Sequence, residues 1–421
     1  MAIRSAAAFR RDEPLASLAF RPETEGNGGS MDTAAIDIFD PKIYAAQRRP
    51  MLEAETLPAW CYTSDAFYRR EVDRIFMKVW NFFGRTDQVP NPGDYYAFEF
   101  AGVPLIILRD REGKVRAFAN TCRHRGALLL DNGTGNCRGL KCPYHGWVYG
   151  LDGALTGAPG MEEAIGFKRE DYGLIPLRLE TWCGFMFVTF DPKAPPLMEF
   201  LGDLPAILKS HNLDDMVTVR RKEFLLDCNW KLFVENAMEG YHIPTVHQAS
   251  ISKHKAKKPA VQDVKGEFVL LFTAQKGSRA LMPGDTGFPE IGSLDERAAN
   301  GSFYPNIYPS TMFCCTQDCM WYLEVHPLGP HRMKLIHGAC FPSEIPKRND
   351  FADVVERYYR RWDKTADEDN HISEVQHRGL LSPLAATGRL SFLEPLVHTI
   401  DNWVLDRVLG EETPAGRGLY E

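Results

Sequence analysis

The amino-acid sequence predicts an α+β protein in which a small all-β unit is inserted into a larger mixed unit. Short apolar runs separated by turn residues predict strands between residues 80 and 190. The Pro-rich segment 191–196 ends that run, and both helical and strand-like periods follow it. With 421 residues, of which 44% are hydrophobic, the chain is long enough to form two or three compact units.

The ordered part of the chain is expected to begin after a flexible tail. Residues 1–30 lack apolar periodicity and end in a Gly-rich stretch at 26–30. An amphipathic helix is predicted over residues 64–80, because apolar residues recur there at helical spacing behind Ser64 and Asp65. These apolar residues are Phe67, Val72, Ile75, Phe76 and Val79.

The all-β unit is predicted to contain short strands at residues 95–100, 105–109, 115–119 and 185–190. Turn residues, such as Asn91 to Asp94, separate them. In the mixed unit we expect a helix over 230–238, strands within 312–326 and 335–341, and a helix over 351–361. This order predicts a sheet that is covered by helices.

The composition excludes several classes of partner. A formal net charge of -7 and a pI near 6.0 argue against nucleic acid, whose phosphates require a basic face. The longest apolar runs are of strand length, so no membrane span is expected. Ten cysteines without a disulfide spacing favour metal ligation in a reducing cytoplasm.

Two short motifs form the first candidate site. A C-x-H motif, Cys122 to His124, is followed after 17 residues by a C-x-x-H motif, Cys142 to His145. Each motif offers one thiolate and one imidazole. A two-iron, two-sulfur cluster with two Cys on one iron and two His on the other is the Rieske arrangement. We therefore predict that these four residues hold a one-electron relay.

The residues around these motifs leave an alternative open. Gly126 follows the first motif and Gly146 the second, so the backbone can approach the cluster sulfurs closely at both places. The same two Cys and two His could instead hold a tetrahedral zinc ion in a zinc-binding interaction module. Cys137 lies between the motifs, outside their spacing, and is expected to be structural.

A second candidate site lies further along the chain. His242 and His247 are five residues apart, and Pro244 is expected to distort the segment so that the two rings converge. Two His and one carboxylate form the facial triad that holds Fe(II) and leaves positions open for dioxygen. The candidates for the distant carboxylate are Asp369, Glu374 and Asp401.

Together the motifs resemble the α subunits of Rieske non-heme iron oxygenases, the ring-hydroxylating oxygenase family. The resemblance rests on CRHRG and CPYHGW, on the run from Asn229 to His247 and on the acidic run at 367–379, and it covers most of the chain after residue 58. It implies a Rieske β-sandwich domain inserted in a helix-covered antiparallel-sheet catalytic domain. It also implies that Asp369 is the third ligand of a mononuclear Fe(II).

The resemblance also implies domain bounds and a link between the two iron sites. We expect a flexible N-terminal extension and lead-in (1–57), a helix of the catalytic domain (58–80), the Rieske 2Fe-2S domain (81–190) and the mononuclear iron catalytic domain (191–421). In this family an acid at the position of Glu239 links subunits. Glu239 is therefore expected to connect His145 of one subunit with His242 of its neighbour in a homotrimer. With a Glu at position 239, the chain resembles the carnitine oxygenase and betaine demethylase branch of the family.

The activity that the resemblance implies is that of a cytoplasmic terminal oxygenase component. The chain shows no dinucleotide fingerprint, so NAD(P)H must act through a flavin/iron-sulfur reductase, with or without a ferredoxin. We expect hydroxylation or dihydroxylation of a small carboxylated aromatic compound, as in aromatic catabolism. One alternative is oxidative N-demethylation or hydroxylation of a quaternary amine of the betaine or carnitine type. The other is an electron carrier without oxygenase activity.

Overall fold

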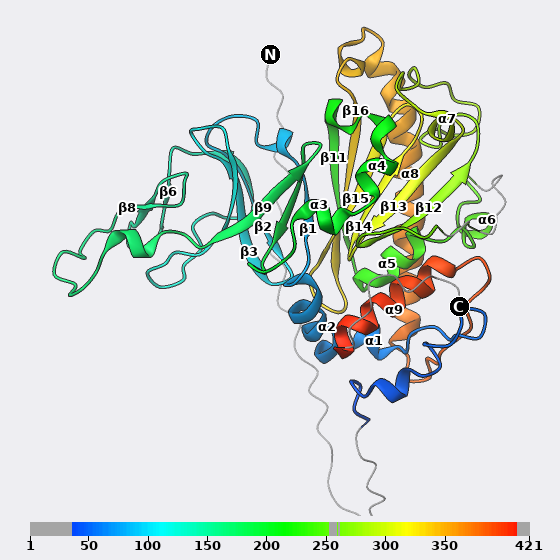
Figure 1. Cartoon of the computed structure of the whole chain (residues 1–421), viewed down its shortest axis with the longest axis horizontal. Helices are drawn as coiled ribbons and strands as arrows, with labels where there is room; N and C mark the ends of the chain where they lie inside the picture. The colour runs from blue at the N-terminus through cyan, green and yellow to red at the C-terminus, as the bar shows by residue number, and fades with distance from the viewer. Residues whose placement is uncertain (1–35, 252–258, 260–261, 411–421) are drawn as a thin grey trace, which may run out of the picture. The chain divides into compact units, whose positions relative to one another are not determined.

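The computed structural model describes residues 36–251, 259 and 262–410. Most of the expected N-terminal extension, residues 1–35, lies outside the described residues. The chain divides at Asp37, and all features discussed below lie in the unit that begins at Ile38. In this unit two large antiparallel sheets, one small antiparallel sheet and a set of helices form the α+β fold that the sequence predicts (Figure 1).

The first sheet belongs to the all-β unit and contains seven antiparallel strands. In sheet order they are β1 (Asn81–Arg85), β10 (Phe185–Thr189), β9 (Pro176–Trp182), β4 (Val115–Ala119), β3 (Val103–Arg109), β2 (Asp94–Phe100) and β5 (Gly133–Asn136). A small separate sheet contains β6 (Leu140–Lys141), β7 (Val148–Tyr149) and β8 (Leu155–Gly157). The unit therefore has the two-sheet β architecture that was expected.

Turn residues explain why the strand predictions were accurate in this unit. β4 covers the predicted residues, and β2 and β3 each extend the prediction toward the N-terminus. Gly93 precedes β2 with φ +89°, and a Cβ there would lie 2.4 Å from the carbonyl oxygen of Cys137. Only glycine fits such a close approach with a positive φ. The chain reversal before β2 thus requires glycine both for its backbone conformation and for its contact with Cys137.

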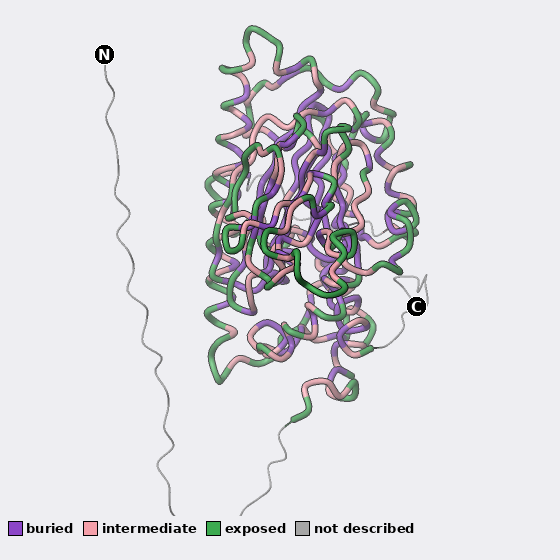
Figure 2. The backbone as a smooth tube through the Cα atoms, turned by 90° about the vertical axis from the view of Figure 1, so that its left-hand side faces the viewer, coloured by how far each residue is buried: buried purple, intermediate pink, exposed green. Residues whose placement is uncertain are grey.

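The second sheet contains six antiparallel strands. In sheet order they are β11 (Met216–Leu226), β16 (Met333–Pro342), β15 (Met320–Pro327), β14 (Thr311–Cys315), β13 (Gly301–Ile307) and β12 (Phe268–Ala274). Strands β13, β14, β15 and β16 are buried over almost their whole length, and the buried segments of the chain lie in the interior of the fold (Figure 2). Arg221 of β11 donates to the Tyr96 hydroxyl of β2 at 2.9 Å, so the two sheets contact each other directly.

The α-helices are α1 (Trp60–Thr63), α2 (Asp65–Glu71), α3 (Leu197–Leu201), α4 (Leu204–Ile207), α5 (Trp230–Ala237), α6 (Ile243–Val246), α7 (Glu296–Ala299), α8 (Phe351–Leu380) and α9 (Pro395–Leu409). Shorter helical turns are η1 (Pro41–Tyr44), η2 (Val72–Phe76), η3 (Thr86–Gln88), η4 (Arg169–Tyr172), η5 (Lys209–His211), η6 (Leu213–Asp215) and η7 (Ile345–Lys347). In the described part of the chain, no helix is both long and apolar enough to span a bilayer.

Helix α8 covers one face of the six-stranded sheet. Its Trp362 ring lies 5.6 Å from that of Trp321 on β15 and 6.1 Å from that of Phe341 on β16. The predicted helix over 351–361 was too short, because α8 continues to Leu380. Buried side chains at Thr365, Ala366 and Ser373 keep one face of the continuation against the protein, although the sequence there is strongly charged.

The segment before the all-β unit packs against helices that follow it in the chain. Ser64 caps α2 by accepting from the Phe67 N–H, and the predicted helix ends with η2 at Phe76. Glu71 of α2 lies 2.5 Å from the Lys231 ammonium of α5, and both side chains are fully buried. The Trp230 indole also donates to Glu71, at 3.1 Å. A buried ion pair therefore joins two segments that flank the all-β unit in sequence.

Candidate functional site

Two loops of the same form carry the first set of candidate ligands. Cys122 follows β4, and Cys142 lies between β6 and β7. In each loop a glycine N–H donates to the cysteine carbonyl, from Gly126 at 2.9 Å and from Gly146 at 3.1 Å. Both glycines have positive φ, at +75° and +71°. The turn after each cysteine is therefore closed by a residue that tolerates this backbone conformation.

The four ligand side chains of these loops converge. The Nδ1 atoms of His124 and His145 lie 3.1 Å apart, so both rings present the same nitrogen to one point. Cys122 and Cys142 are buried, whereas His145 is exposed. Two buried thiols beneath two outer imidazoles form a donor set that fits a two-iron, two-sulfur cluster with its His-ligated iron near the surface.

Hydrogen bonds to the sulfur atoms prepare the site for a negatively charged group. Burial opposes ionisation of Cys142, but the backbone N–H groups of Tyr144 and His145 outweigh burial and lower the pKa of its thiol. The Tyr149 hydroxyl lies 3.2 Å from Sγ of Cys122 and accepts from the Arg123 N–H. Such contacts stabilise thiolate and tune the potential of a bound cluster.

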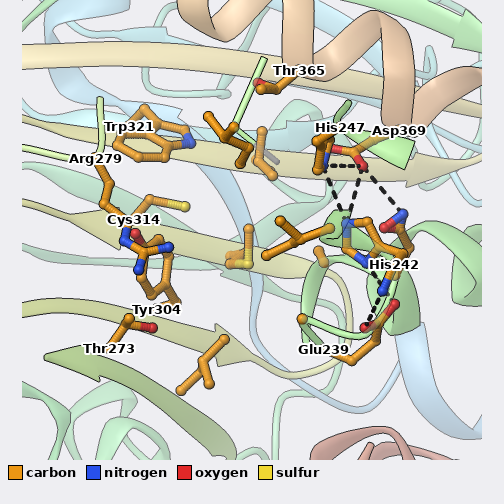
Figure 3. A pocket seen from close by; sticks show the side chains of 18 of the residues that line it. Glu239, His242, His247, Thr273, Arg279, Tyr304, Cys314, Trp321, Thr365 and Asp369 are labelled. Atoms are coloured by element: carbon orange, nitrogen blue, oxygen red, sulfur yellow. Dashed lines mark hydrogen bonds and ion pairs between the residues drawn. The ribbon is translucent and has the colours of Figure 1, made fainter. Parts of the chain in front are cut away.

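The second set of ligands meets at one point, as Figure 3 shows. Nε2 of His242 lies 3.2 Å from Nε2 of His247. Oδ1 of Asp369 lies 3.5 Å from the first nitrogen and 3.1 Å from the second. In the described residues this is the one group of side chains with the geometry to share a metal ion. Two imidazoles and one carboxylate fit a facial iron site with open positions.

Local structure explains how residues five apart can converge. Helix α5 ends at Ala237, and the single turn α6 starts after His242 and ends before His247. Pro244 lies in the first turn of α6, where its missing N–H costs nothing. Pro244 was expected to distort the segment and so bring the rings together, but it fits the start of a short helix without distorting it. The two rings meet because they flank one short turn.

Asp369 reaches the same point from helix α8. Its Oδ1 also accepts from Nδ2 of Asn236 on α5, at 3.3 Å. The other carboxylates considered from the sequence lie elsewhere. Glu374 accepts from the Asp227 N–H at 3.1 Å. Asp401 is buried beside Glu235, and burial raises its pKa to about 7.

Each imidazole of the second set contacts a further carboxylate through its other ring nitrogen. Glu239 lies 2.5 Å from Nδ1 of His242 and accepts from the N–H groups of Tyr241 and His242. Glu368 lies 2.8 Å from Nδ1 of His247. Burial opposes protonation of His247, but Asp369 and Glu368 outweigh it and raise its pKa. These acids orient the rings and fix which nitrogen faces a metal.

Glu368 was missed in the sequence, although it adjoins Asp369. Ser250 donates to Glu368 at 2.5 Å, and Lys364 lies 3.5 Å from its other oxygen. Burial would raise the pKa of Glu368, but the hydrogen bonds from Ser250 and His247 outweigh burial and lower it. Glu368 directly precedes Asp369 in the sequence, and this position beside a candidate ligand could have indicated its role.

A cavity of about 840 Å³ opens at the second set of ligands. Its apolar and aromatic walls come from α5, α8 and the strands of the six-stranded sheet, and include Phe233, Phe272, Tyr304, Trp321 and Trp362. Tyr304 and Trp321 face this cavity, whereas Phe303, Tyr308 and Tyr322 are buried and do not line it. Arg279, Arg361 and His337 also line it and were not anticipated.

Comparisons with known proteins agree with both sites. Residues 79–177 match the family described as the Rieske [2Fe-2S] domain, and residues 213–410 match the ring hydroxylating alpha subunit (catalytic domain). A protein that only carries electrons would need no catalytic domain, so the match over residues 213–410 argues against the electron-carrier alternative. The first match identifies the cluster as Rieske-type rather than a zinc site.

Relatives of known name extend these matches. The chloroplastic choline monooxygenase of Spinacia oleracea is 31% identical over 87% of this chain and 80% of its own length. The glycine betaine monooxygenase oxygenase subunit of Pseudomonas aeruginosa (strain UCBPP-PA14) is 25% identical over 90% of this chain and 97% of its own.

Solved structures share the fold. The quaternary ammonium Rieske monooxygenase CntA, in complex with its substrate L-carnitine, aligns with a TM-score of 0.71 at 24% identity, over 88% of this chain and 99% of its own. Naphthalene 1,2-dioxygenase from Rhodococcus sp. aligns with a TM-score of 0.67 at 21% identity, over 90% of this chain and 100% of its own. With a Rieske 2Fe-2S domain and a mononuclear iron domain in one chain, the protein belongs to the family of Rieske ring-hydroxylating oxygenase alpha subunits.

Proposed function

We propose that this oxygenase component oxidises a small quaternary ammonium compound, by hydroxylating a carbon attached to its nitrogen or by oxidative N-demethylation. The relatives named above act, by their names, on choline, glycine betaine and L-carnitine. This substrate class was the alternative in the sequence-based expectation. The support for it exceeds the support for a carboxylated aromatic compound.

The observation that carries the proposal is the aromatic cavity at the metal ligands. Phe233, Tyr304, Trp321 and Trp362 line the same cavity as His242, His247 and Asp369. Aromatic faces attract a quaternary ammonium through cation–π interactions while the methyl groups bury apolar surface. A cation bound there lies beside the place where dioxygen is activated.

Within this proposal each predicted ligand has one role. Cys122, His124, Cys142 and His145 hold the Rieske cluster, and the three side chains His242, His247 and Asp369 hold Fe(II). The bound iron supplies reductive activation of dioxygen. Glu239 and Glu368 hold the two imidazoles in the tautomer that leaves Nε2 free. The walls of the cavity limit the access of water to the substrate.

The arrangement of the two sites supports a homotrimer. Strands β6 and β8, beside the cluster loops, and α6, beside the iron ligands, lie at opposite sides of the fold (Figure 1). Exposed His145 is available to a neighbouring subunit, and Glu239 already contacts His242. We therefore propose that Glu239 joins His242 to His145 of a neighbouring subunit. A flavin/iron-sulfur reductase, with or without a ferredoxin, delivers the electrons of NAD(P)H to the cluster.

A carboxylated aromatic substrate remains the second candidate. The rings of Trp321 and Trp362 pack on each other with their centroids 5.6 Å apart, and both line the cavity, so the surface that they present to it suits an aromatic ring as well as an ammonium group. The solved naphthalene dioxygenases have the same fold. None of the ten cysteines, all of which lie in the described residues, forms a disulfide, and this fits the cytoplasmic location that we propose.

The test is substrate-dependent oxygen consumption. Protein loaded with cluster and Fe(II) is mixed with a reductase, NADH and either choline, glycine betaine, L-carnitine, γ-butyrobetaine or benzoate. We expect at least one quaternary amine to raise oxygen uptake in step with an oxidised product detected by mass spectrometry. Asp369→Asn should keep the cluster absorbance and lose this uptake. Coupled uptake with benzoate alone would overturn the proposal in favour of the second candidate.

A further inference from the structure

Two arginines line the cavity without a carboxylate partner. Arg361 is only 8% exposed, and its Nε has no hydrogen-bond partner in the structure. Its Nη1 donates to the Thr365 hydroxyl at 3.1 Å. Arg279 donates through Nε to the side-chain oxygen of Gln275. Across the described part of the chain, no carboxylate forms an ion pair with either guanidinium.

Burying the Arg361 guanidinium in this way costs free energy unless an anion binds to it. A buried guanidinium without a counter-ion loses hydration that only pairing or hydrogen bonding restores. Burial accordingly lowers the pKa of Arg361, and the nearby Arg279 lowers it further, while Tyr304, Cys314 and the more distant carboxylate of Asp369 act in the opposite direction without reversing the shift. The guanidinium of Arg361 lies 5.3 Å from the centre of the Trp321 ring, which holds its plane in place.

Helix α8 sets the distance between Arg361 and the metal ligand Asp369. Arg361, Thr365 and Asp369 are spaced four residues apart and all line the cavity, so they share one face of the helix. A rise of 1.5 Å per residue places the Cα atoms of Arg361 and Asp369 about 12 Å apart along the axis. A small molecule can therefore lie between the two.

The charges of the cavity are divided between its two ends. Arg279 lies beside Tyr304, Cys314 and Trp321, across the cavity from His242 and Asp369 (Figure 3). The carboxylates Glu239 and Asp369 lie at the metal end. A zwitterion with its ammonium toward the metal end and its anionic group toward the arginines matches this division.

We propose that Arg361 and Arg279 bind the carboxylate of the substrate, which makes the natural substrate a quaternary ammonium carboxylate rather than a cationic alcohol such as choline. The inference rests on the proposed function and narrows it. Arginine presents a planar fork of N–H donors that matches a carboxylate with two hydrogen bonds. Two guanidinium groups also repel a substrate with positive charge alone, which adds discrimination against choline.

The first experiment compares two molecules that differ in charge at one end. γ-Butyrobetaine and its methyl ester have the same ammonium group, but the ester lacks the anion. Binding to the metal-loaded protein is measured by anaerobic calorimetry, and kcat/KM by product formation. We expect the acid to bind about 10- to 100-fold more tightly than the ester and to have a kcat/KM that is higher by a similar factor. Hydrogen bonds to charged groups contribute more than neutral ones. Glycine betaine and choline form a second pair, with the same expected order.

The second experiment removes the guanidinium groups one at a time. Arg361→Gln and Arg279→Gln should each reduce the preference for acid over ester by about 10-fold or more, while the ester itself is affected less. Arg361→Lys keeps the charge but not the planar fork, and should recover only part of the preference. Arg360→Gln is the matched control, because Arg360 is the adjacent residue on α8, is exposed and pairs with Asp285.

The outcomes separate this inference from the proposed function. If the wild-type protein oxidises the ester and choline as well as the two acids, the arginine inference fails and the quaternary-amine function stands. If no quaternary amine is oxidised at all, the proposed function fails. If Arg361→Gln lowers kcat/KM equally for acid and ester, Arg361 has only the structural role of packing on Trp321. A loss of preference confined to the acids supports the inference.

Discussion

The carboxylate of Glu368 lies 2.8 Å from Nδ1 of His247, while Nε2 of the same ring faces Asp369 at 3.1 Å. His242 repeats this arrangement, with Glu239 at its Nδ1 and Asp369 3.5 Å from its Nε2. Each imidazole is therefore held between an outer and an inner acid. An outer acid keeps the proton on Nδ1 and increases the basicity of the nitrogen that faces the metal.

Glu368→Ala is expected to weaken Fe(II) binding about 10- to 100-fold, because His247 loses the acceptor that fixes its orientation. Iron retained after dialysis against a chelator measures this change, and the absorbance of the Rieske cluster provides an internal reference. Glu356→Ala is the control, since Glu356 is exposed on the same helix. Equal iron retention in the two variants would contradict a role for Glu368 at the metal.

Glu239→Gln is expected to keep both iron centres and to slow electron transfer between them by about 10-fold or more. The amide retains the shape of the side chain but loses the charge that contacts Nδ1 of His242. Stopped-flow absorbance of a pre-reduced cluster, mixed with oxygen and substrate, measures the rate. Glu239→Asp should be faster than Glu239→Gln, because it restores the charge. A wild-type rate in Glu239→Gln would argue against the proposed link to a neighbouring subunit.

Tyr149→Phe is expected to make the reduction potential of the cluster more negative without loss of iron. The variant removes the hydroxyl that lies 3.2 Å from Sγ of Cys122, and such a contact stabilises the extra negative charge of the reduced cluster. Protein-film voltammetry measures the potential. Tyr172→Phe is the comparison, because Tyr172 packs in the same domain against Trp147. Identical potentials in the two variants would show that the hydroxyl does not act on the cluster.

Asp401→Asn is expected to flatten the dependence of thermal stability on pH. Burial raises the pKa of Asp401 to about 7, whereas an Asp in an unfolded chain has a pKa of about 3.9. Between these values the folded state binds the proton more strongly, so this contribution to stability is present at low pH and is lost as pH rises toward 7. The Tm of the variant relative to wild type should therefore increase from pH 5 to pH 8. If the Tm of the variant and the Tm of the wild type changed in parallel with pH, the raised pKa of Asp401 would be contradicted.

The sequence predicted most reliably those features that are fixed locally. Strand β4 was located to the residue, because turn residues delimit it on the N-terminal side. The candidate cluster and iron ligands were predicted from the spacing of Cys122, His124, Cys142 and His145 and of His242 and His247, and the structure brings His124 close to His145 and His242 close to His247. Spacing within a short segment survives folding unchanged, so it can be read without a structure.

Features that depend on distant segments were missed. Helix α8 was predicted to end at Arg361, because the charged residues that follow give little apolar signal, yet the helix continues to Leu380. Arg361 and Arg279 are 82 residues apart in sequence and come together only through the packing of α8 on the sheet. The environment of an arginine in a charged stretch cannot be judged from its neighbours in the chain.

The buried pair of Glu71 and Lys231 also constrains the order of events during synthesis. Glu71 leaves the ribosome before the whole cluster domain, but its partner emerges only after that domain is complete. Leaving one charge of such a pair buried alone costs about 3–5 kcal/mol. Glu71 can therefore be buried with its partner only after the chain of the Rieske domain has been synthesised, so the packing of α2 on α5 follows the synthesis of that domain.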